Sequence, residues 1–462
     1  MTAPEAAPAG LEPVERLPAG GLPAKPRSLR HRLRLNIRGR SVTLRGLRRP
    51  PIGLLRWLLI IGPGLIATSA GNDAGGITTY SAAGARYGYD LIWVMLLLTP
   101  ALALVQELSA RLGAATGRGL LDLIRERYGL GWGLFATGSV LAANTGLIVS
   151  EFMGLAAAGE LFGLSRWVVV PLAAAVLWYL VLFGSYGAVE KLFLAMTLVF
   201  FAYPVAAVLA RPDWSAVARG ALVPTLSADP AYLLMVVGLL GTTITPYMQV
   251  FQQSSTVERG VARRHYGPER VDAGFGAMFS NLMSVAMMIA TAATLHAAGQ
   301  RDLGSAADAA RALEPVVGAA AGQLFAVGLA GACLLAGAVL PLATAYAVSE
   351  MLGAPHSVSL DFRRAPLFFG LFTALLAVGA LLALIPGLPV VALLLLVQVA
   401  NGLLLPVTLL FMLRLSNDAR LMGPLRNSRR YNVAAWVVLI GITGAVVVML
   451  GSQVLGWVAG GG

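Results

Sequence analysis

Long apolar segments, separated by short polar ones, fill the chain from residue 54 to residue 456. A transmembrane helix needs about 20 consecutive apolar residues to cross the hydrocarbon core of a bilayer. The pattern therefore predicts an all-α polytopic membrane protein with eleven transmembrane helices. These spans are expected at roughly 54–82, 88–112, 132–160, 167–187, 192–210, 232–255, 271–297, 320–348, 367–385, 388–412 and 433–456.

The first span contains a polar break, because residues 71–76 read Gly-Asn-Asp-Ala-Gly-Gly. An aspartate at the centre of a membrane helix costs about 3 kcal/mol on insertion scales. Unwound backbone is tolerated at this depth only where protein buries it or where it lines a cavity. The break therefore predicts an ion or substrate site of a transporter, with Asp73 as its charged ligand. The spans carry no Lys or Arg at mid-depth that would pair with Asp73.

The sixth span is interrupted at residues 241–247, which read Gly-Thr-Thr-Ile-Thr-Pro-Tyr. Pro246 removes a helical hydrogen bond and clashes with the preceding turn, although a proline kink alone is also common in membrane helices. Spans one and six hold equivalent positions in two five-span halves. Paired interruptions of this kind mark the midplane site of an inverted-repeat transporter. The sequence therefore predicts a leucine-transporter-type fold of two inverted five-helix repeats plus one helix, with helices 1 and 6 unwound at the midplane.

Composition and charge support a membrane location. The chain has 57% hydrophobic and 12% charged residues, with a mean hydropathy of +0.76, which excludes a water-soluble domain of this size. Of its 34 Lys and Arg residues, 28 lie in the first 56 residues or after even-numbered spans, and 6 lie in the opposite loops. This asymmetry predicts a cell (plasma or inner) membrane protein with a cytoplasmic N-terminus and an outside C-terminus. It accounts for the net charge of +12 without nucleic acid.

The distribution of charge and apolar residues divides the chain into two regions. Residues 1–50 are rich in Arg and Pro and lack an apolar signal sequence, so we expect a basic, disordered cytoplasmic tail that is a candidate for binding anionic lipid. Residues 51–460 form the predicted transporter domain in the lipid bilayer. The sequence has no phosphate-binding glycine loop with Lys, so neither an ATP-driven pump nor an enzyme is predicted. No cofactor is expected other than the transported ion.

Several motifs within residues 55–415 resemble those of the Nramp family of divalent-metal transporters. The matching segments are Gly62-Pro63-Gly64-Leu65, Asp73-Ala74-Gly75-Gly76 against the family's Asp-Pro-Gly-Asn, Gln106-Glu107-Leu108-Ser109-Ala110-Arg111 in span two, Glu151-Phe152-Met153-Gly154 in span three, Thr245-Pro246-Tyr247 against the family's Met-Pro-His, and Gln398 in span ten. The resemblance implies a metal site between spans one and six. The expected metal-binding positions are Asp73, Ala74, Gly75, Gly76, Thr242, Thr245 and Gln398.

The chain departs from the family's pattern at two of these positions. Gly76 stands where the family has Asn, and Thr245 stands where it has Met. Loss of the thioether leaves only oxygen ligands, which suit magnesium, calcium or manganese better than softer transition metals. Loss of two larger side chains is expected to widen the pocket, and a wet pocket suits magnesium, which keeps several waters. These changes resemble the Nramp-related magnesium-transporter branch.

Proton coupling is also expected to differ from the family's pattern. Glu151 is kept as an intramembrane carboxylate, but the family's Asp three residues earlier is Ile148. The family's two span-six histidines are replaced by Tyr247 and Gln252. Histidine is the side chain that ordinarily titrates near neutral pH. Glu151, Tyr247 and Gln252 are thus the candidate ion or proton pathway, and coupling is predicted to be weak or absent.

The predicted function is import of a divalent cation, magnesium or manganese, into the cytoplasm by alternating access, as a secondary-type transporter or uniporter. Two alternatives stay open from the sequence. One is a proton-coupled manganese or iron importer whose site tolerates Gly76 and Thr245. The other is a sodium-coupled carrier of an organic, amino-acid-like solute on the same fold.

Overall fold

The computed structural model describes residues 34–37, 40–43, 71–183, 202–261, 263, 266–303, 320–358 and 360–460. The chain divides into two units, Met1–Trp57 and Leu58–Gly462, and each is described by itself. The elements are β1 Arg34–Ile37, β2 Arg40–Thr43, α3 Ala74–Tyr87, α4 Ile92–Thr116, α5 Leu120–Tyr128, α6 Leu130–Leu161, α7 Arg166–Phe183, α9 Ala202–Leu209, α10 Trp214–Leu222, α11 Pro230–Thr243, α12 Pro246–Glu258, α13 Tyr266–Thr291, η3 Ala292–His296, α16 Ala320–Leu352, α17 Pro366–Ala383, α18 Val390–Ser416, α19 Ala419–Met422, η4 Gly423–Leu425 and α20 Arg429–Gly460.

In the first unit, β1 and β2 pair as an antiparallel two-stranded sheet. These two four-residue strands lie within residues 1–50, for which the sequence predicts a disordered tail. Leu35 and Ile37 alternate with polar residues, and Leu35 lies opposite Val42 in the ladder. Such alternation of apolar and polar side chains favours a strand. The rest of residues 1–50, with its expected contact to anionic lipid, falls outside the described residues.

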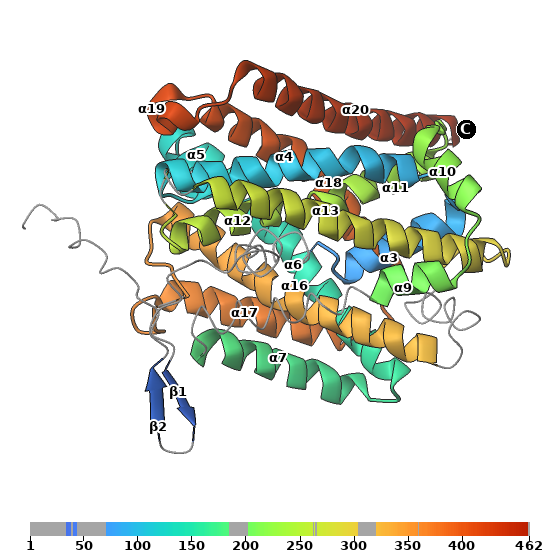
Figure 1. Ribbon diagram of the computed structural model, residues 1–462, viewed down its shortest axis with the longest axis horizontal. Helices are drawn as coiled ribbons and strands as arrows, with labels where there is room; N and C mark the ends of the chain where they lie inside the picture. Colours follow the sequence, from blue (N-terminus) through green and yellow to red (C-terminus); the bar gives the residue numbers. More distant parts are fainter. Residues whose placement is uncertain are drawn as a thin grey trace, which may run out of the picture. The chain divides into compact units, whose positions relative to one another are not determined.

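The secondary-structure elements in the described part of the second unit are all helices (Figure 1). Nine of the described helical segments are long and apolar enough to cross a membrane. They correspond to nine of the predicted spans, with α11 and α12 together forming the sixth. The other two predicted spans, 54–82 and 192–210, fall partly outside the described residues, which contain α3 and α9 from them.

The interruption of span six lies between α11 and α12. The first helix ends at Thr243, where Ile244 N donates to Leu240 O at 3.0 Å, and the second begins at Pro246. Proline is favoured in the first turn of a helix because its missing N–H would have no intrahelical partner there. In the first predicted span, which also contains an interruption, a turn at residues 71–73 leads into α3.

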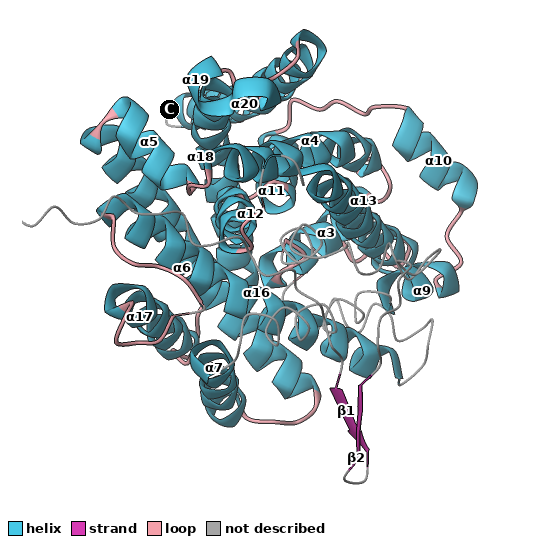
Figure 2. Ribbon diagram, turned by 60° about the vertical axis from the view of Figure 1, so that its left-hand side comes forward, coloured by secondary structure: helices cyan, strands magenta, loops and turns pink. Residues whose placement is uncertain are grey.

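Helix α3 lies among the helices of the second unit and contacts α6, α11, α13 and α18 (Figure 2). Long helices around it are joined by buried amides. Asn144 Nδ2 on α6 donates to Thr344 Oγ1 on α16 at 2.7 Å, and Asn281 Nδ2 on α13 donates to the Met95 carbonyl on α4 at 2.6 Å. Each such bond between membrane helices contributes about 0.6 to 2 kcal/mol. These bonds hold the frame in which the start of α3 is buried.

Candidate metal-ion site

Asp73 stands at the N-terminus of α3 as its N-cap. Its carboxylate accepts a hydrogen bond from Gly76 N at 2.5 Å, which satisfies one of the amides that a helix leaves unpaired at its start. The residue is 1% exposed. The local sequence therefore places a buried carboxylate where the helix dipole stabilises negative charge.

A second carboxylate reaches the same helix end from α6. Glu151 Oε2 accepts a hydrogen bond from Ala74 N at 3.2 Å, and the side chain is fully buried. Gly154, one turn further along α6, permits this approach: a Cβ there would lie 2.6 Å from the Ala74 side chain and 2.6 Å from Cys333 Sγ. The Glu-Phe-Met-Gly motif thus brings Glu151 to the backbone beside Asp73.

Gln398 on α18 covers Asp73 from a third direction. Its Nε2 donates to Asp73 Oδ1 at 3.2 Å and lies 3.5 Å from Oδ2, while Asn401 Nδ2 donates to Gln398 Oε1 at 3.2 Å. Gly75 makes room for this amide, since a Cβ at that position would lie 2.2 Å from Gln398 Nε2. The predicted placement of Gln398 beside the site is therefore seen in the structure.

Three oxygen atoms converge next to Gly76. The point where a Cβ of residue 76 would lie is 2.7 Å from Gly71 O, 3.0 Å from Thr242 Oγ1 and 3.1 Å from Asp73 Oδ1. Thr242 Oγ1 is buried and has no hydrogen-bond partner among the described residues. The Gly71 carbonyl was not among the predicted ligands, and its only sequence signal is that Gly71 begins the polar break.

The surroundings of Gly76 are crowded, because three oxygens lie within 3.1 Å of the position at which an Asn side chain would begin. The space is small because Gly71 and Thr242 approach α3 closely. The widening of the pocket expected from the loss of two larger side chains stays a prediction.

Residues of α12 complete the neighbourhood. Thr245 is the N-cap of α12, and its buried hydroxyl has no hydrogen-bond partner within the described part of the chain. Tyr247 is fully buried in the first turn of α12, two residues after Thr245. Gln252 lies roughly 7.5 Å further along the helix axis than Tyr247, at 1.5 Å per residue, so it stands apart from the immediate site.

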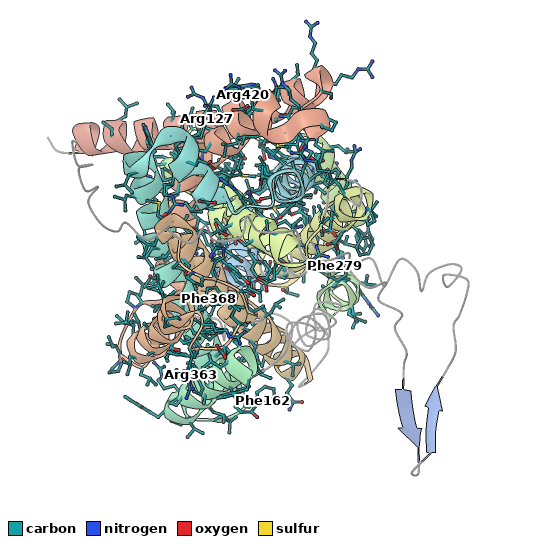
Figure 3. All side chains as sticks on the ribbon, turned by 90° about the vertical axis from the view of Figure 1, so that its left-hand side faces the viewer. Arg127, Phe162, Phe279, Arg363, Phe368 and Arg420 are labelled. Atoms are coloured by element: carbon teal, nitrogen blue, oxygen red, sulfur yellow. The ribbon has the colours of Figure 1, made fainter. Side chains whose placement is uncertain are left out.

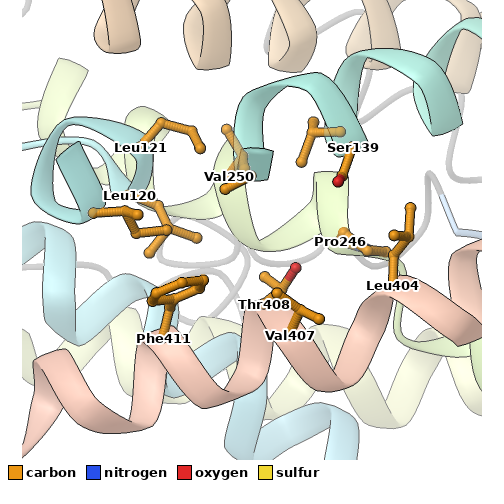
Figure 4. A pocket seen from close by; sticks show the side chains of 12 residues that line it. Leu120, Leu121, Ser139, Pro246, Val250, Leu404, Val407, Thr408 and Phe411 are labelled. Atoms are coloured by element: carbon orange, nitrogen blue, oxygen red, sulfur yellow. The ribbon is translucent and has the colours of Figure 1, made fainter. Parts of the chain in front are cut away.

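An apolar cavity of about 20 Å³, lined in part by Pro246, lies between α5, α6, α12 and α18 (Figure 4). Only two hydroxyl side chains, Ser139 and Thr408, interrupt its hydrocarbon lining. Hydrophobic constrictions oppose the passage of hydrated ions because water is expelled from them. This cavity is therefore a poor route for a cation, and the polar groups around Asp73 form the better candidate site.

The groups around Asp73 that could bind a metal ion offer oxygen atoms as ligands. Among the residues that the structure describes, no group of three or more His, Cys, Asp or Glu side chains could hold a metal ion. The candidate site instead combines carboxylate, carbonyl, hydroxyl and amide oxygens, which suit hard divalent cations. A site with few charged ligands also favours release, which a transported ion requires.

Comparison with known proteins identifies the family of the chain. A family model described as "Natural resistance-associated macrophage protein-like" matches residues 64–452. The divalent metal cation transporter MntH of Deinococcus radiodurans is 33% identical over 416 residues, covering 87% of this chain and 91% of the relative. MntH of Ralstonia nicotianae is 34% identical over 419 residues, covering 84% of this chain and 89% of the relative.

Solved structures share the fold. The manganese transporter of Eremococcus coleocola superposes with a TM-score of 0.72 at 19% identity, covering 88% of this chain and 90% of the other. A Na⁺-coupled sialic acid symporter superposes with a TM-score of 0.53 at 11% identity, covering 85% and 90%. At these identities the likeness concerns the fold alone. It is the leucine-transporter-type architecture that the paired interruptions predict.

Proposed function

Since the chain belongs to the Nramp family of membrane transporters, we propose that it imports magnesium or manganese into the cytoplasm with weak or no proton coupling. The relatives' names support a divalent metal as substrate rather than an organic solute. The replacement of the family's Met and Asn by Thr245 and Gly76 supports a hard ion and the magnesium-transporter branch.

One observation carries the proposal. The Asp73 carboxylate, the Gly71 carbonyl and the Thr242 hydroxyl converge beside Gly76, and the Thr242 hydroxyl has no hydrogen-bond partner among the described residues. A buried polar atom without a partner is costly, so an oxygen in this position favours a cation or water as its partner. We expect Thr245 and Gln398 to complete the ligand set, partly through water.

The driving force does not require a proton. A charge moving through 100 mV gains about 2.3 kcal/mol, so a divalent cation gains about 4.6 kcal/mol on entering a negative cytoplasm. The asymmetry of Lys and Arg supports a cytoplasmic N-terminus and an outside C-terminus. We infer that Glu151 and Tyr247 shape the ion's surroundings, because no histidine of the described spans lies beside Asp73 to carry protons.

The test is uptake of magnesium and manganese into proteoliposomes by the wild type, Asp73→Ala and the matched control Asp302→Ala. Asp302 is an exposed carboxylate, so its loss is expected to leave uptake unchanged. Loss of the buried ligand in Asp73→Ala should lower uptake of either ion at least tenfold, about 1.4 kcal/mol or more of binding. Equal uptake by both variants would remove Asp73 from the site.

A proton-coupled manganese or iron importer is the second candidate, favoured by the fold shared with a manganese transporter. Two readouts in the same proteoliposomes separate the candidates. Strong competition by cadmium, a soft ion, together with acidification of the lumen during uptake, supports the second candidate. Magnesium uptake without acidification supports the proposal.

A further inference from the structure

An open cavity of about 710 Å³ lies between the end of α5, the α18–α19 connection and the start of α20, away from Asp73. Its lining combines arginines with amphipathic aromatic residues. The lining residues are Arg127, Tyr128, Leu413, Arg414, Asn417, Asp418, Arg420 and Trp436. The cavity lies on the side of the membrane where most Lys and Arg residues are found, which we propose to be the cytoplasmic side.

The cavity has uncompensated positive charge. Arg127 Nε pairs with Asp418 at 3.2 Å. Among the described residues, no acidic side chain pairs with Arg414 or Arg420. Three arginines against one aspartate leave a formal charge of +2 in the cavity. Arginine recognises phosphate through its planar set of N–H donors, so this cavity suits a phosphate-bearing ligand.

A neighbouring cavity also contains arginines, but these arginines are paired with carboxylates. The cavity near the end of α16 is lined by Arg118 and Arg125, but Arg118 pairs with Glu126, and Arg125 pairs with Asp122 at 2.7 Å. Glu350 also lines that cavity. Both arginines of that cavity are thus paired with carboxylates, which leaves neither guanidinium free for a phosphate.

Apolar surface adjoins the basic cavity. Trp436 is 40% exposed, and Val433 and Val437 on the same helix are exposed by 59% and 64%. On α6, Trp132 is 54% exposed, and its ring lies 5.7 Å from that of Phe411, which in turn lies 5.2 Å from that of Tyr128. Trp and Tyr are enriched where lipid headgroups meet the hydrocarbon region. The ligand that fits both surfaces carries a phosphate at one end and hydrocarbon at the other.

We propose that this cavity binds the headgroup of an anionic glycerophospholipid, with its acyl chains along the apolar faces of α20 and α6. Arg414 and Arg420 hold the phosphate, and Trp436 lies at the boundary between headgroup and chains. Basic pockets between membrane helices on the cytoplasmic side bind anionic lipid in this way. The bound lipid links the α18–α19 connection to the start of α20.

The test is lipid retention by the purified full chain, measured by native mass spectrometry during titration with phosphatidylglycerol or phosphatidylcholine. The variants are Arg414→Ala/Arg420→Ala, the charge-keeping Arg414→Lys/Arg420→Lys, and the control Arg363→Ala/Arg364→Ala. The control removes the same charge from a loop that lies far from Arg127 and Arg420 (Figure 3). Wild type and control should prefer phosphatidylglycerol. The Ala pair should bind it about 30-fold more weakly, since each Arg near anionic lipid contributes about fivefold.

Three results would overturn the proposal. One is equal phosphatidylglycerol binding by the Ala pair and the wild type. Another is an equal loss in the Arg363→Ala/Arg364→Ala control, which would indicate general surface charge. The third is full displacement by millimolar inorganic phosphate, which would make free phosphate the ligand. If the Ala pair does not fold, weaker binding of phosphatidylglycerol by the Lys pair than by wild type supports the site, and unchanged binding contradicts it.

Discussion

Thr245 begins α12 with a buried hydroxyl that has no hydrogen-bond partner within the described part of the chain. A hydroxyl oxygen is a hard ligand, whereas the family's Met at this position offers a soft thioether. We therefore expect residue 245 to set which class of metal the site prefers.

Thr245→Met should make the transporter more sensitive to cadmium. Adding one soft ligand is expected to strengthen cadmium competition against manganese uptake about tenfold, or about 1.4 kcal/mol. The larger side chain is expected to cost about 1 to 3 kcal/mol of stability through overpacking. Thr408→Met is the control, because Thr408 lines the apolar cavity that Pro246 also lines. If both variants respond equally to cadmium, residue 245 does not contact the ion.

At the scale of residues, part of the candidate site could be predicted from the sequence and part could not. The burial of Asp73 among the helices could be predicted, because a charge inside an apolar run is costly unless protein surrounds it. The Gly71 carbonyl could not, since every residue has a carbonyl and only the fold decides where it points. The crowding around Gly76 was likewise invisible, because it depends on how closely Thr242 approaches from another helix.

At the scale of elements, α11 and α18 are in very close contact at Gly241. A Cβ on Gly241 would lie 1.9 Å from Gln398 O and 2.5 Å from Gly402 N, both backbone atoms of α18. Small residues let membrane helices approach in this way. This contact also fixes the part of α18 from which Gln398 reaches Asp73.

Gly241→Ala should therefore separate α11 from α18. We expect a loss of about 1 to 3 kcal/mol of stability from overpacking, together with slower metal uptake as Gln398 moves away from Asp73. Gly441→Ala in α20 is the matched control, because a Cβ there meets no atom within 4 Å. Thermal unfolding followed by size-exclusion chromatography measures the first effect. An unchanged melting temperature in Gly241→Ala would show that the helices can move apart freely.

Some secondary-structure elements can be predicted from the sequence more readily than others. Spans such as 390–416 are marked by length and hydropathy alone, and the interruption between α11 and α12 is marked by Pro246. The β1–β2 pairing was missed because a high density of arginine suggested a solvated tail, while the short alternation in 34–43 was overlooked. A short strand has only a few residues in which alternation can be recognised, so the overall composition of the segment easily outweighs this signal.

At the scale of the whole molecule, the asymmetry of Lys and Arg implies an orientation in the membrane. With the alternation of spans fixed by the whole distribution, the loop containing Gln300 is expected outside the cell and the loop containing Arg363 inside. The only cysteine, Cys333, is buried, so the natural chain is a suitable background for thiol labelling.

Single-cysteine labelling with a membrane-impermeant maleimide tests this orientation. Gln300→Cys should react in intact cells, whereas Arg363→Cys should react only after the cells are permeabilised. Both native residues are exposed, so burial does not explain a difference between them. The wild type, with Cys333 alone, sets the background. The reverse pattern of labelling would invert the proposed topology and make the basic cavity face outward.

The hydrogen bonds on Asp73 bear on the return half of a transport cycle. A carrier that moves one ion without a counter-ion must come back empty, and a bare carboxylate would then have to change its surroundings without a neutralising partner. In the structure, Gly76 N and Gln398 Nε2 both donate to the Asp73 carboxylate. Under the proposed function, a metal ion that binds Asp73 displaces the Gln398 amide, and the amide returns to the carboxylate when the ion leaves. We expect this exchange of partners to stabilise the carboxylate on the return step, so that the carrier needs no proton to reset.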